Sequence, residues 1–158
     1  MHHEVATKRQ SINLDGWMLT KSQTLESFHR NTAGCDVAIV EGVMGLYDGR
    51  DGKSDDGSTA QIAKWLGAAV ILVLDCWAMA RSAAAMVKGF CEFDAELNIG
   101  GILLNKVRQR PARQRGNDWL SSVTIPARAV RLAQRGPAVL RRLMPDMRFL
   151  NSSRYCCC

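Results

Sequence analysis

The chain has 158 residues, 47% of them hydrophobic, which is enough to bury the core of about one domain. Its formal net charge of +6 is unevenly placed, because residues 1–105 hold 9 Lys and Arg against 13 Asp and Glu, whereas residues 106–158 hold 12 against 2. The longest apolar run, AAVILVL, is too short to cross a bilayer, and MHHEVATKRQ lacks the apolar core of a signal peptide. These features argue against a membrane or secreted protein and predict a cytoplasmic one.

Helices and strands are predicted to alternate from residue 20 to residue 105. In order, the sequence indicates helix, strand, helix, strand, helix and strand over residues 20–34, 36–41, 57–68, 69–75, 79–90 and 99–104. The helix at 57–68 has clear end signals, since Ser58 or Thr59 can cap its first amides and Gly67 can end it. The run AVILVLD is apolar on both faces, as expected for a strand buried in a parallel sheet.

This alternation is typical of an α/β fold with a doubly wound parallel sheet. Ligands of such sheets bind at the carboxyl ends of the strands. The three predicted strands end at Glu41, Asp75 and Asn105. We therefore expect three adjacent parallel strands whose polar end residues meet at one edge of the sheet.

The alternation stops after Asn105. The basic segment 106–158 contains all four prolines of the chain, and eleven of its twelve basic residues are Arg. Short helices are conceivable at 129–136 and 138–144, but no regular pattern continues. An arginine-rich arm that binds nucleic acid is one interpretation, and an irregular tail that is disordered or non-native is the other. The second is favoured, because aromatic residues that stack on bases are scarce in this segment.

Glu41 is the first candidate for chemistry. A carboxylate at a strand end, followed at once by Gly42, can hold Mg²⁺ directly or through water beside bound phosphates. Asp48, in the loop that follows, can act as a second acid near the metal or can orient a substrate group. Both could equally be solvated surface acids. Ser58 and Thr59 are interpreted as helix caps rather than nucleophiles, since no histidine lies near them in the sequence.

Three other site patterns are absent from the sequence. The phosphate-binding motif G-x-x-x-x-G-K-[ST] does not occur, because GKS at 52–54 lacks the preceding glycine. The segment DGRDGKSDDG, residues 48–57, does not follow the EF-hand pattern and is interpreted as a glycine-hinged loop whose acids stay hydrated. HHE at 2–4 lacks the second histidine of a zinc protease motif.

Five stretches taken together carry a family resemblance. They are NLDGWML, VAIVEGVMGLYDG, STAQIAKWLGA, VILVLDCWAMARSAAAMVKGF and GGILLNKV. This set resembles the cobyrinic acid a,c-diamide synthase family over about residues 1–107. The resemblance implies a partial nucleotide-binding domain of the CobQ/CobB/MinD/ParA type, with a P-loop-NTPase-like sheet similar to that of dethiobiotin synthetase. The segment 108–158 would then be a basic, irregular tail outside this domain.

The resemblance also implies an activity. Members of the family use ATP and Mg²⁺ to activate two peripheral carboxylates of a corrinoid as acyl phosphates. Ammonia, released from glutamine by a glutaminase domain, then converts them to amides. No nucleic acid or membrane partner is implied.

Individual site residues follow from the same resemblance. It places Glu41 at the metal and the γ-phosphate, Asp48 close to the reacting carboxylate, and Asn105 near the adenine. Secondary candidates for the nucleotide site, with capping or packing as their alternative roles, are Thr59, Asp75 and Arg81.

The sequence also departs from the family. Members have a P-loop strand and helix and a substrate loop before this region, so Met1 corresponds to an internal position. After Val107 the tail matches neither the next α/β unit nor the glutaminase domain. We therefore expect a fragment, truncated at both ends, that does not form the diamide alone. The alternatives are a MinD/ParA-type ATPase switch, which usually has aspartate at the position of Glu41, and a non-catalytic remnant.

Overall fold

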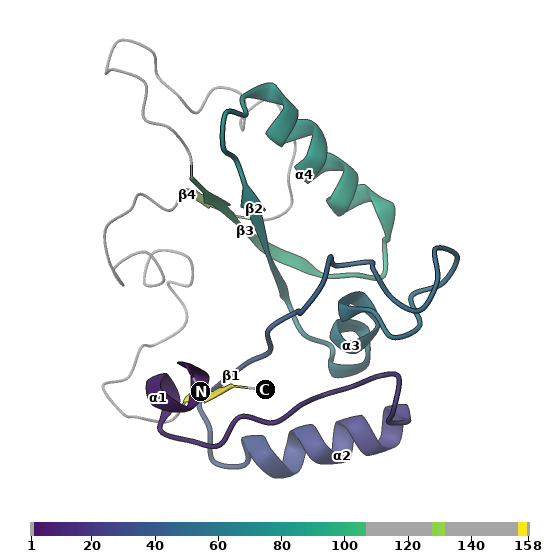
Figure 1. Cartoon of the computed structure of the whole chain (residues 1–158), viewed down its shortest axis with the longest axis vertical. Coiled ribbons are helices and arrows are strands. Elements are labelled where there is room, and N and C mark those ends of the chain that lie inside the picture. Colours follow the sequence, from purple (N-terminus) through teal and green to yellow (C-terminus); the bar gives the residue numbers. More distant parts are fainter. Residues whose placement is uncertain (1, 107–127, 132–154, 158) are drawn as a thin grey trace. The chain divides into compact units, whose positions relative to one another are not determined.

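The computed structural model describes residues 2–106, 128–131 and 155–157 (Figure 1). They fall into two compact units, the first formed by residues up to 68 together with 155–157, and the second by residues 69–106 together with 128–131. Both units contain helices and parallel strands, so the expected α/β class is confirmed. The remainder of the predicted tail, including the conceivable helix at 138–144, lies outside the described residues.

The first unit contains three helices and one parallel strand pair. Its elements are α1 (His2–Thr7), α2 (Lys21–Thr32), β1 (Val37–Ile39), α3 (Thr59–Leu66) and β5 (Tyr155–Cys157). The strands β1 and β5 are parallel, with Val37 opposite Tyr155. Helices α2 and α3 pack against each other. The helix α1 was not predicted from the sequence.

The predicted ends of α3 are confirmed. Ser58 is the N-cap, because its Oγ accepts a hydrogen bond of 3.1 Å from the backbone N–H of Gln61, and Thr59 is the first helical residue. Gly67 ends the helix in the left-handed conformation with φ 61°, and its N–H bonds to the carbonyl of Lys64. The local signals in the sequence were therefore sufficient to place this helix.

The second unit is a three-stranded sheet covered by one helix. Its elements are β2 (Val70–Asp75), α4 (Arg81–Phe93), β3 (Ile99–Asn105) and β4 (Arg128–Arg131). The sheet has the order β2-β3-β4 with parallel neighbours. Helix α4 lies along one face of it (Figure 1). The buried hydrophobic residues of α4, β2 and β3 include Leu72, Leu74, Ala83, Ala84, Val87, Ile102 and Leu104.

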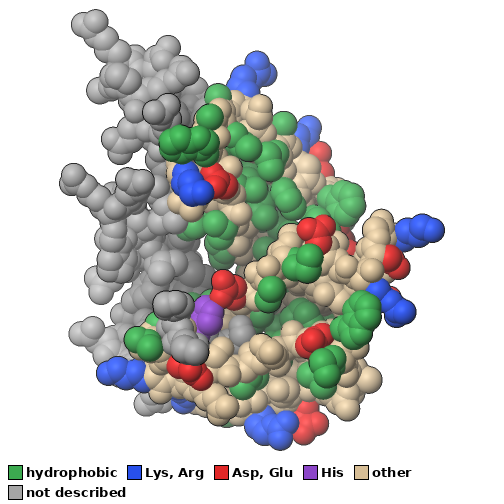
Figure 2. All heavy atoms as spheres, in the orientation of Figure 1, with side chains coloured by type: hydrophobic (Ala, Val, Ile, Leu, Met, Phe, Trp, Pro, Cys, Tyr) green, Lys and Arg blue, Asp and Glu red, His purple; other side chains and the backbone are tan. Residues whose placement is uncertain are grey.

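The opposite face of β2 is more open than the apolar sequence predicts. In the part of the chain that the structure describes, Ile71 is 37% exposed and Val73 is 58% exposed. Hydrophobic side chains are visible on the surface of this unit in Figure 2. The alternation of buried and exposed residues along β2 is that of a strand with one covered face.

The predicted sheet of three adjacent strands is wrong in one respect. The strands β2 and β3 are parallel neighbours, as expected, but β1 pairs with β5 in a separate two-stranded sheet. Both edges of β3 are occupied, one by β2 and the other by β4. With only three residues, β1 offers few ladder hydrogen bonds to select a partner. The strand β4 lies inside the segment that was expected to be irregular.

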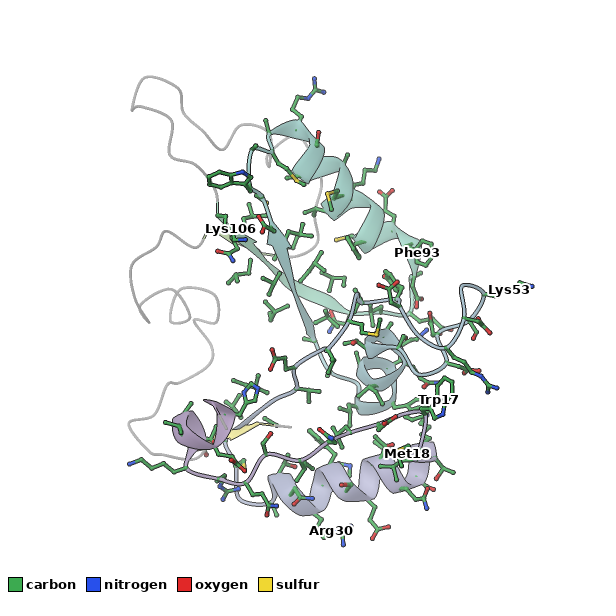
Figure 3. All side chains as sticks on the ribbon, viewed as in Figure 1. Trp17, Met18, Arg30, Lys53, Phe93 and Lys106 are labelled. Carbon is green, nitrogen blue, oxygen red and sulfur yellow. The ribbon has the colours of Figure 1, made fainter. Side chains whose placement is uncertain are left out.

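The carboxyl ends of β2 and β3 are joined by polar contacts. Asp75 is opposite Asn105 in the register. The carboxylate of Asp75 accepts hydrogen bonds from Lys106 Nζ at 2.5 Å and from the backbone N–H of Trp77 at 3.0 Å. Figure 3 shows Lys106 at the end of β3. The hydrogen bond from Lys106, and secondly that from Trp77, lower the pKa of Asp75 below its usual value.

A pair of glycine substitutions tests the end of α3. Gly67 has φ 61°, and a Cβ there would meet no atom within 4 Å, so Gly67→Ala adds backbone strain but no clash. We expect it to lower the free energy of unfolding by about 1 kcal/mol in urea titrations followed by circular dichroism. Gly89→Ala is the matched control, because Gly89 lies inside α4 with similar open space around it.

The control should instead stabilise the protein, since alanine favours a helix interior by roughly 0.5–1 kcal/mol over glycine. Equal effects of the two substitutions would contradict the left-handed end of α3.

The ion pair at the strand ends gives a pH prediction. Because the pKa of Asp75 is lowered in the folded chain, its contribution to stability is present above the unfolded pKa of about 3.9 and is lost as the pH falls through the lower folded value. Lys106→Met removes the hydrogen bond that contributes most to the lowered pKa, so the pKa of Asp75 should rise towards its ordinary value. Carboxyl chemical shifts measured against pH check this. The same substitution at Lys88, an exposed residue of α4, should leave the pKa of Asp75 unchanged.

Candidate functional site

The loop that carries both predicted acids is attached to the start of α3. Leu46 is buried, and its carbonyl accepts a hydrogen bond of 2.9 Å from the backbone N–H of Ala60. Gly42 lies so close to Thr59 that a Cβ would stand 2.8 Å from the Thr59 side chain. Only glycine permits this approach. The loop from 41 to 48 therefore has a defined position on α3, with Thr59 beside the residue that follows Glu41.

Glu41 lies two residues beyond the end of β1, not within the strand as predicted. Its side chain is 65% exposed, and its Oε2 is 2.5 Å from Nε2 of His3 in α1. An exposed carboxylate can bind Mg²⁺ with one oxygen while water supplies other ligands. The contact with His3 was missed by sequence reasoning, which considered His3 only within the HHE triplet.

Asp48 is held by a turn in the same loop. Its backbone N–H donates to the carbonyl of Gly45 at 3.0 Å. Its carboxylate folds back over Gly45, where a Cβ would stand 2.1 Å from Oδ2 of Asp48. Glu41 and Asp48 thus belong to one loop with a fixed backbone, and both are exposed to solvent.

The loop from 48 to 57 is more internally bonded than predicted. Oδ1 of Asp51 accepts hydrogen bonds from the backbone N–H groups of Lys53 at 2.8 Å and Ser54 at 2.9 Å, which lower the pKa of Asp51. Asp55 forms a salt bridge of 2.5 Å with Lys64 of α3. Asp51 is nevertheless exposed, as expected for a hydrated acid, whereas Asp55 is half-buried and paired with Lys64, which the sequence did not predict.

The start of α3 does not replace a phosphate-binding loop. Two of its first N–H groups are already used, that of Ala60 by Leu46 and that of Gln61 by the Ser58 side chain. Anion sites at helix N-termini require free amides. Thr59, predicted as a cofactor-binding residue, is half-buried against Gly42. A packing role for Thr59 is what its contacts support.

The remaining predicted residues lie in the second unit. Each oxygen of Asp75 accepts one hydrogen bond, from Trp77 or from Lys106, and these bonds join the strand ends. Oδ1 of Asn105 accepts from the N–H of Lys106 at 2.9 Å, which leaves its NH₂ group as the donor that could meet a base edge. Arg81 is the exposed first residue of α4.

The predicted residues thus form two groups, Glu41, Asp48 and Thr59 in the first unit and Asp75 and Asn105 in the second. Among the described residues, no three or more His, Cys, Asp or Glu side chains cluster as a metal site. A Mg²⁺ ion at Glu41 would therefore depend on water and ligand oxygens, as is usual for this cation. No described helix is both long and apolar enough to span a membrane.

Curated proteins of related sequence share one activity in their names. The chain is 48% identical over 123 residues to cobyrinate a,c-diamide synthase of Syntrophotalea carbinolica, a match that covers 78% of this chain and 26% of that protein. It is 47% identical over 104 residues to cobyrinate a,c-diamide synthase of Picrophilus torridus, with 66% and 24% covered. It is 43% identical over 129 residues to hydrogenobyrinate a,c-diamide synthase of Streptomyces coelicolor, with 82% and 26% covered.

The third match includes every predicted site residue. A match to 129 of the 158 residues leaves 29 for both ends together, so it spans residues 30–129 wherever it begins. It therefore also extends beyond residue 107, where the motifs seen in the sequence end. No protein-family model matches the chain, and no solved structure matches it significantly.

The chain spans about a quarter of the length of the curated relatives that it matches. Identities of 43–48% are far above those expected between unrelated sequences, and they cover most of this chain. The chain belongs to the cobyrinate a,c-diamide synthase family.

Proposed function

We propose that this chain is part of the nucleotide- and substrate-binding domain of a ligase of cobalamin biosynthesis. The ligase uses ATP and Mg²⁺ to convert the a and c carboxylates of cobyrinate or hydrogenobyrinate to amides. The observation that carries the proposal is the similarity to the Syntrophotalea carbinolica and Streptomyces coelicolor synthases, named for cobyrinate and hydrogenobyrinate, whose matches both include residues 36–123 and so the Glu41–Asp48 loop. The domain would have the P-loop-NTPase-like sheet of the broader group.

The proposed reaction has two stages. A substrate carboxylate oxygen attacks the γ-phosphorus of ATP, and ADP leaves, so that an acyl phosphate forms. Ammonia then attacks the acyl carbon and displaces phosphate, which leaves the amide. Ammonia would come from glutamine through a glutaminase domain. Phosphoryl transfer of this kind depends mainly on positioning and on neutralising charge.

Glu41 would be the metal ligand. Its exposed carboxylate lies after β1, and the glycine that follows it holds the loop against Thr59. Mg²⁺ bound there would supply positive charge beside the transferred phosphate. His3 touches the same carboxylate, so it would have to give up one oxygen of Glu41 or share it.

The other residues have supporting roles in this proposal. Asp48, on the loop of Glu41, would orient the reacting carboxylate and receive protons from the incoming ammonia. Asn105 would donate its NH₂ group to the adenine. Asp75 would keep Asn105 in place through the hydrogen bonds that join the ends of β2 and β3.

A substitution at Glu41 tests the proposed function. The test uses the Syntrophotalea carbinolica synthase in which the matching segment has been replaced by the segment of this chain. In that chimera, Glu41→Gln should reduce diamide formation by roughly 100-fold, because it removes one charge directed at the metal. The substitution changes the side-chain shape very little. The measurement is the rate of corrinoid amidation at saturating Mg-ATP, with and without excess Mg²⁺.

Glu26→Gln is the matched control, since Glu26 is an exposed glutamate of α2 whose nearest cation, Arg30, is 3.9 Å away. It should leave the rate unchanged. If the two variants behave alike, Glu41 is not the metal ligand.

A polypeptide of these 158 residues should bind Mg-ATP only weakly. The sequence has no G-x-x-x-x-G-K-[ST] motif, and the first amides of α3 are bonded within the chain. Isothermal titration should give a dissociation constant well above the micromolar range. Micromolar binding with steady ATP hydrolysis would instead support the ATPase-switch alternative.

A further inference from the structure

A small cavity lies beside the α3 helix in the first unit, and none of the residues that line it has a role assigned above. Its volume is about 250 Å³, and it is lined by Gly16, Trp17, Arg50, Asp56, Gly57 and Gln61. Figure 3 labels Trp17 at one end of this unit and Lys53 at the tip of the neighbouring loop, pointing outwards. The cavity is smaller than the roughly 300–1,000 Å³ of sites for drug-sized ligands, so it suits one part of a larger molecule.

The indole of Trp17 is presented to solvent by a rigid turn. Oδ1 of Asp15 accepts hydrogen bonds from the backbone N–H groups of Trp17 at 2.8 Å and Met18 at 3.3 Å. Gly16 packs so closely on α3 that a Cβ would stand 2.8 Å from Oε1 of Gln61. The Trp17 side chain is nevertheless 66% exposed. A large apolar ring held by a fixed backbone and left in water is typical of a binding surface.

Arg50 is placed over this ring from the opposite loop. Its guanidinium carbon is 5.1 Å from the Trp17 ring centroid, within the range of a cation–π contact. Its backbone N–H donates to the carbonyl of Asp56 at 2.7 Å, which closes the loop. Gly57 has a φ of 76° and lies beside the ring, because a Cβ there would be 3.7 Å from Cε3 of Trp17. The lack of a side chain at Gly57 leaves that side of the ring open.

The side-chain amide of Gln61 is already paired within the cavity. The side-chain carbonyl of Gln61 accepts from the N–H of Gly57 at 3.0 Å, and its NH₂ group donates to the carboxylate of Asp56 at 3.0 Å. The guanidinium of Arg50 makes no salt bridge or hydrogen bond with any described residue. It is therefore the group that can offer N–H donors to a ligand, and its planar fork matches a carboxylate.

We propose that Trp17 and Arg50 form a recognition subsite for the corrinoid acid, with a peripheral carboxylate on Arg50 and the adjoining ring edge on Trp17. This inference rests on the proposed function. Arg50 is two residues after Asp48, so the subsite adjoins the loop assigned to the reacting carboxylate. A substrate with several carboxylates would be repelled by the acids of this loop, and Arg50 supplies the opposing charge.

A nucleotide could use the same chemistry, with its base on Trp17 and a phosphate on Arg50. The corrinoid acid is favoured, because the cavity lies in the loop segment of Asp48 and the nucleotide site is assigned to the carboxyl ends of the strands. The experiment below distinguishes the two ligands.

The test is binding of cobyrinate and of Mg-ATP to the 158-residue chain, measured separately by equilibrium dialysis. Arg50→Gln should weaken cobyrinate binding about tenfold, which is the usual loss for a charged hydrogen bond. Arg50→Lys should give a smaller loss, because lysine keeps the charge but lacks the planar fork. Trp17→Ala should weaken binding more than Trp17→Phe. Lys53→Gln is the matched control, since it removes an equal charge from the exposed tip of the same loop.

The proposal is overturned if the chain does not bind cobyrinate, or if Arg50→Gln and Lys53→Gln have the same effect. It is also overturned if the Arg50 and Trp17 variants weaken Mg-ATP binding instead. A second measurement uses the segment-exchanged synthase, where Arg50→Gln should raise the KM for cobyrinate and leave the KM for Mg-ATP unchanged.

The two proposals can fail independently. If Glu41→Gln abolishes amidation while Arg50→Gln leaves the KM for cobyrinate unchanged, the subsite is wrong and the proposed function stands. If the Arg50 variants lose cobyrinate binding while Glu41→Gln has no effect on amidation, the subsite stands and the assigned role of Glu41 is wrong.

Discussion

The hydrogen bond from Ala60 N–H to the carbonyl of Leu46 is the contact on which the first unit depends. It joins the loop of Glu41 and Asp48 to the first turn of α3. Two more segments meet the same helix, the 16–17 turn at Gln61 and the 48–57 loop through the salt bridge of Asp55 with Lys64. Glycines make this convergence possible, because side chains at Gly16 or Gly42 would overlap α3 atoms. A short helix of eight residues thus positions every loop to which a binding role is assigned in this unit.

The sequence predicted correctly those features that depend on contacts between residues close together in the chain. Helix α3 was placed correctly from Ser58 and Gly67, because the cap and the left-handed end are contacts within a few residues. The partner of β1 was predicted wrongly, because strand pairing is a non-local interaction that no periodicity reveals. The strand β4 lies in a segment with no recognisable sequence pattern. It forms by pairing with β3, which is again a contact between distant residues. The match to the Streptomyces coelicolor synthase likewise extends beyond residue 107, into a segment where the sequence showed no regular pattern.

Some features of the candidate site could likewise be predicted from the sequence, and others could not. The strand-end position predicted Glu41 as a carboxylate available to a ligand, and its exposure agrees with that role. The contact of His3 with Glu41 joins residues 38 positions apart in the sequence, so no spacing rule could have found it. Trp17 stood within one of the motifs that carry the family resemblance, but its role needed Arg50, 33 positions later, to be seen beside it. For Thr59 and Asp75 the structure adds contacts that the sequence did not show, with Gly42 and with Lys106.

Charge explains why the two proposed sites belong on neighbouring loops. Both ligands of the proposed reaction are polyanions, and the loop between 41 and 56 carries Glu41, Asp48, Asp51, Asp55 and Asp56. The carboxylate of Asp51 accepts two backbone N–H hydrogen bonds, and that of Asp55 is paired with Lys64. Glu41 and Asp48 retain their exposure, so a phosphate can approach Glu41 only with a cation between them. A substrate carboxylate can approach Asp48 only if another cation compensates, and the guanidinium of Arg50, held over Trp17, is the cation on that loop in a fixed position. In the proposed site, each anion would therefore approach the acids only beside a positive charge, Mg²⁺ at Glu41 and the guanidinium of Arg50 near Asp48.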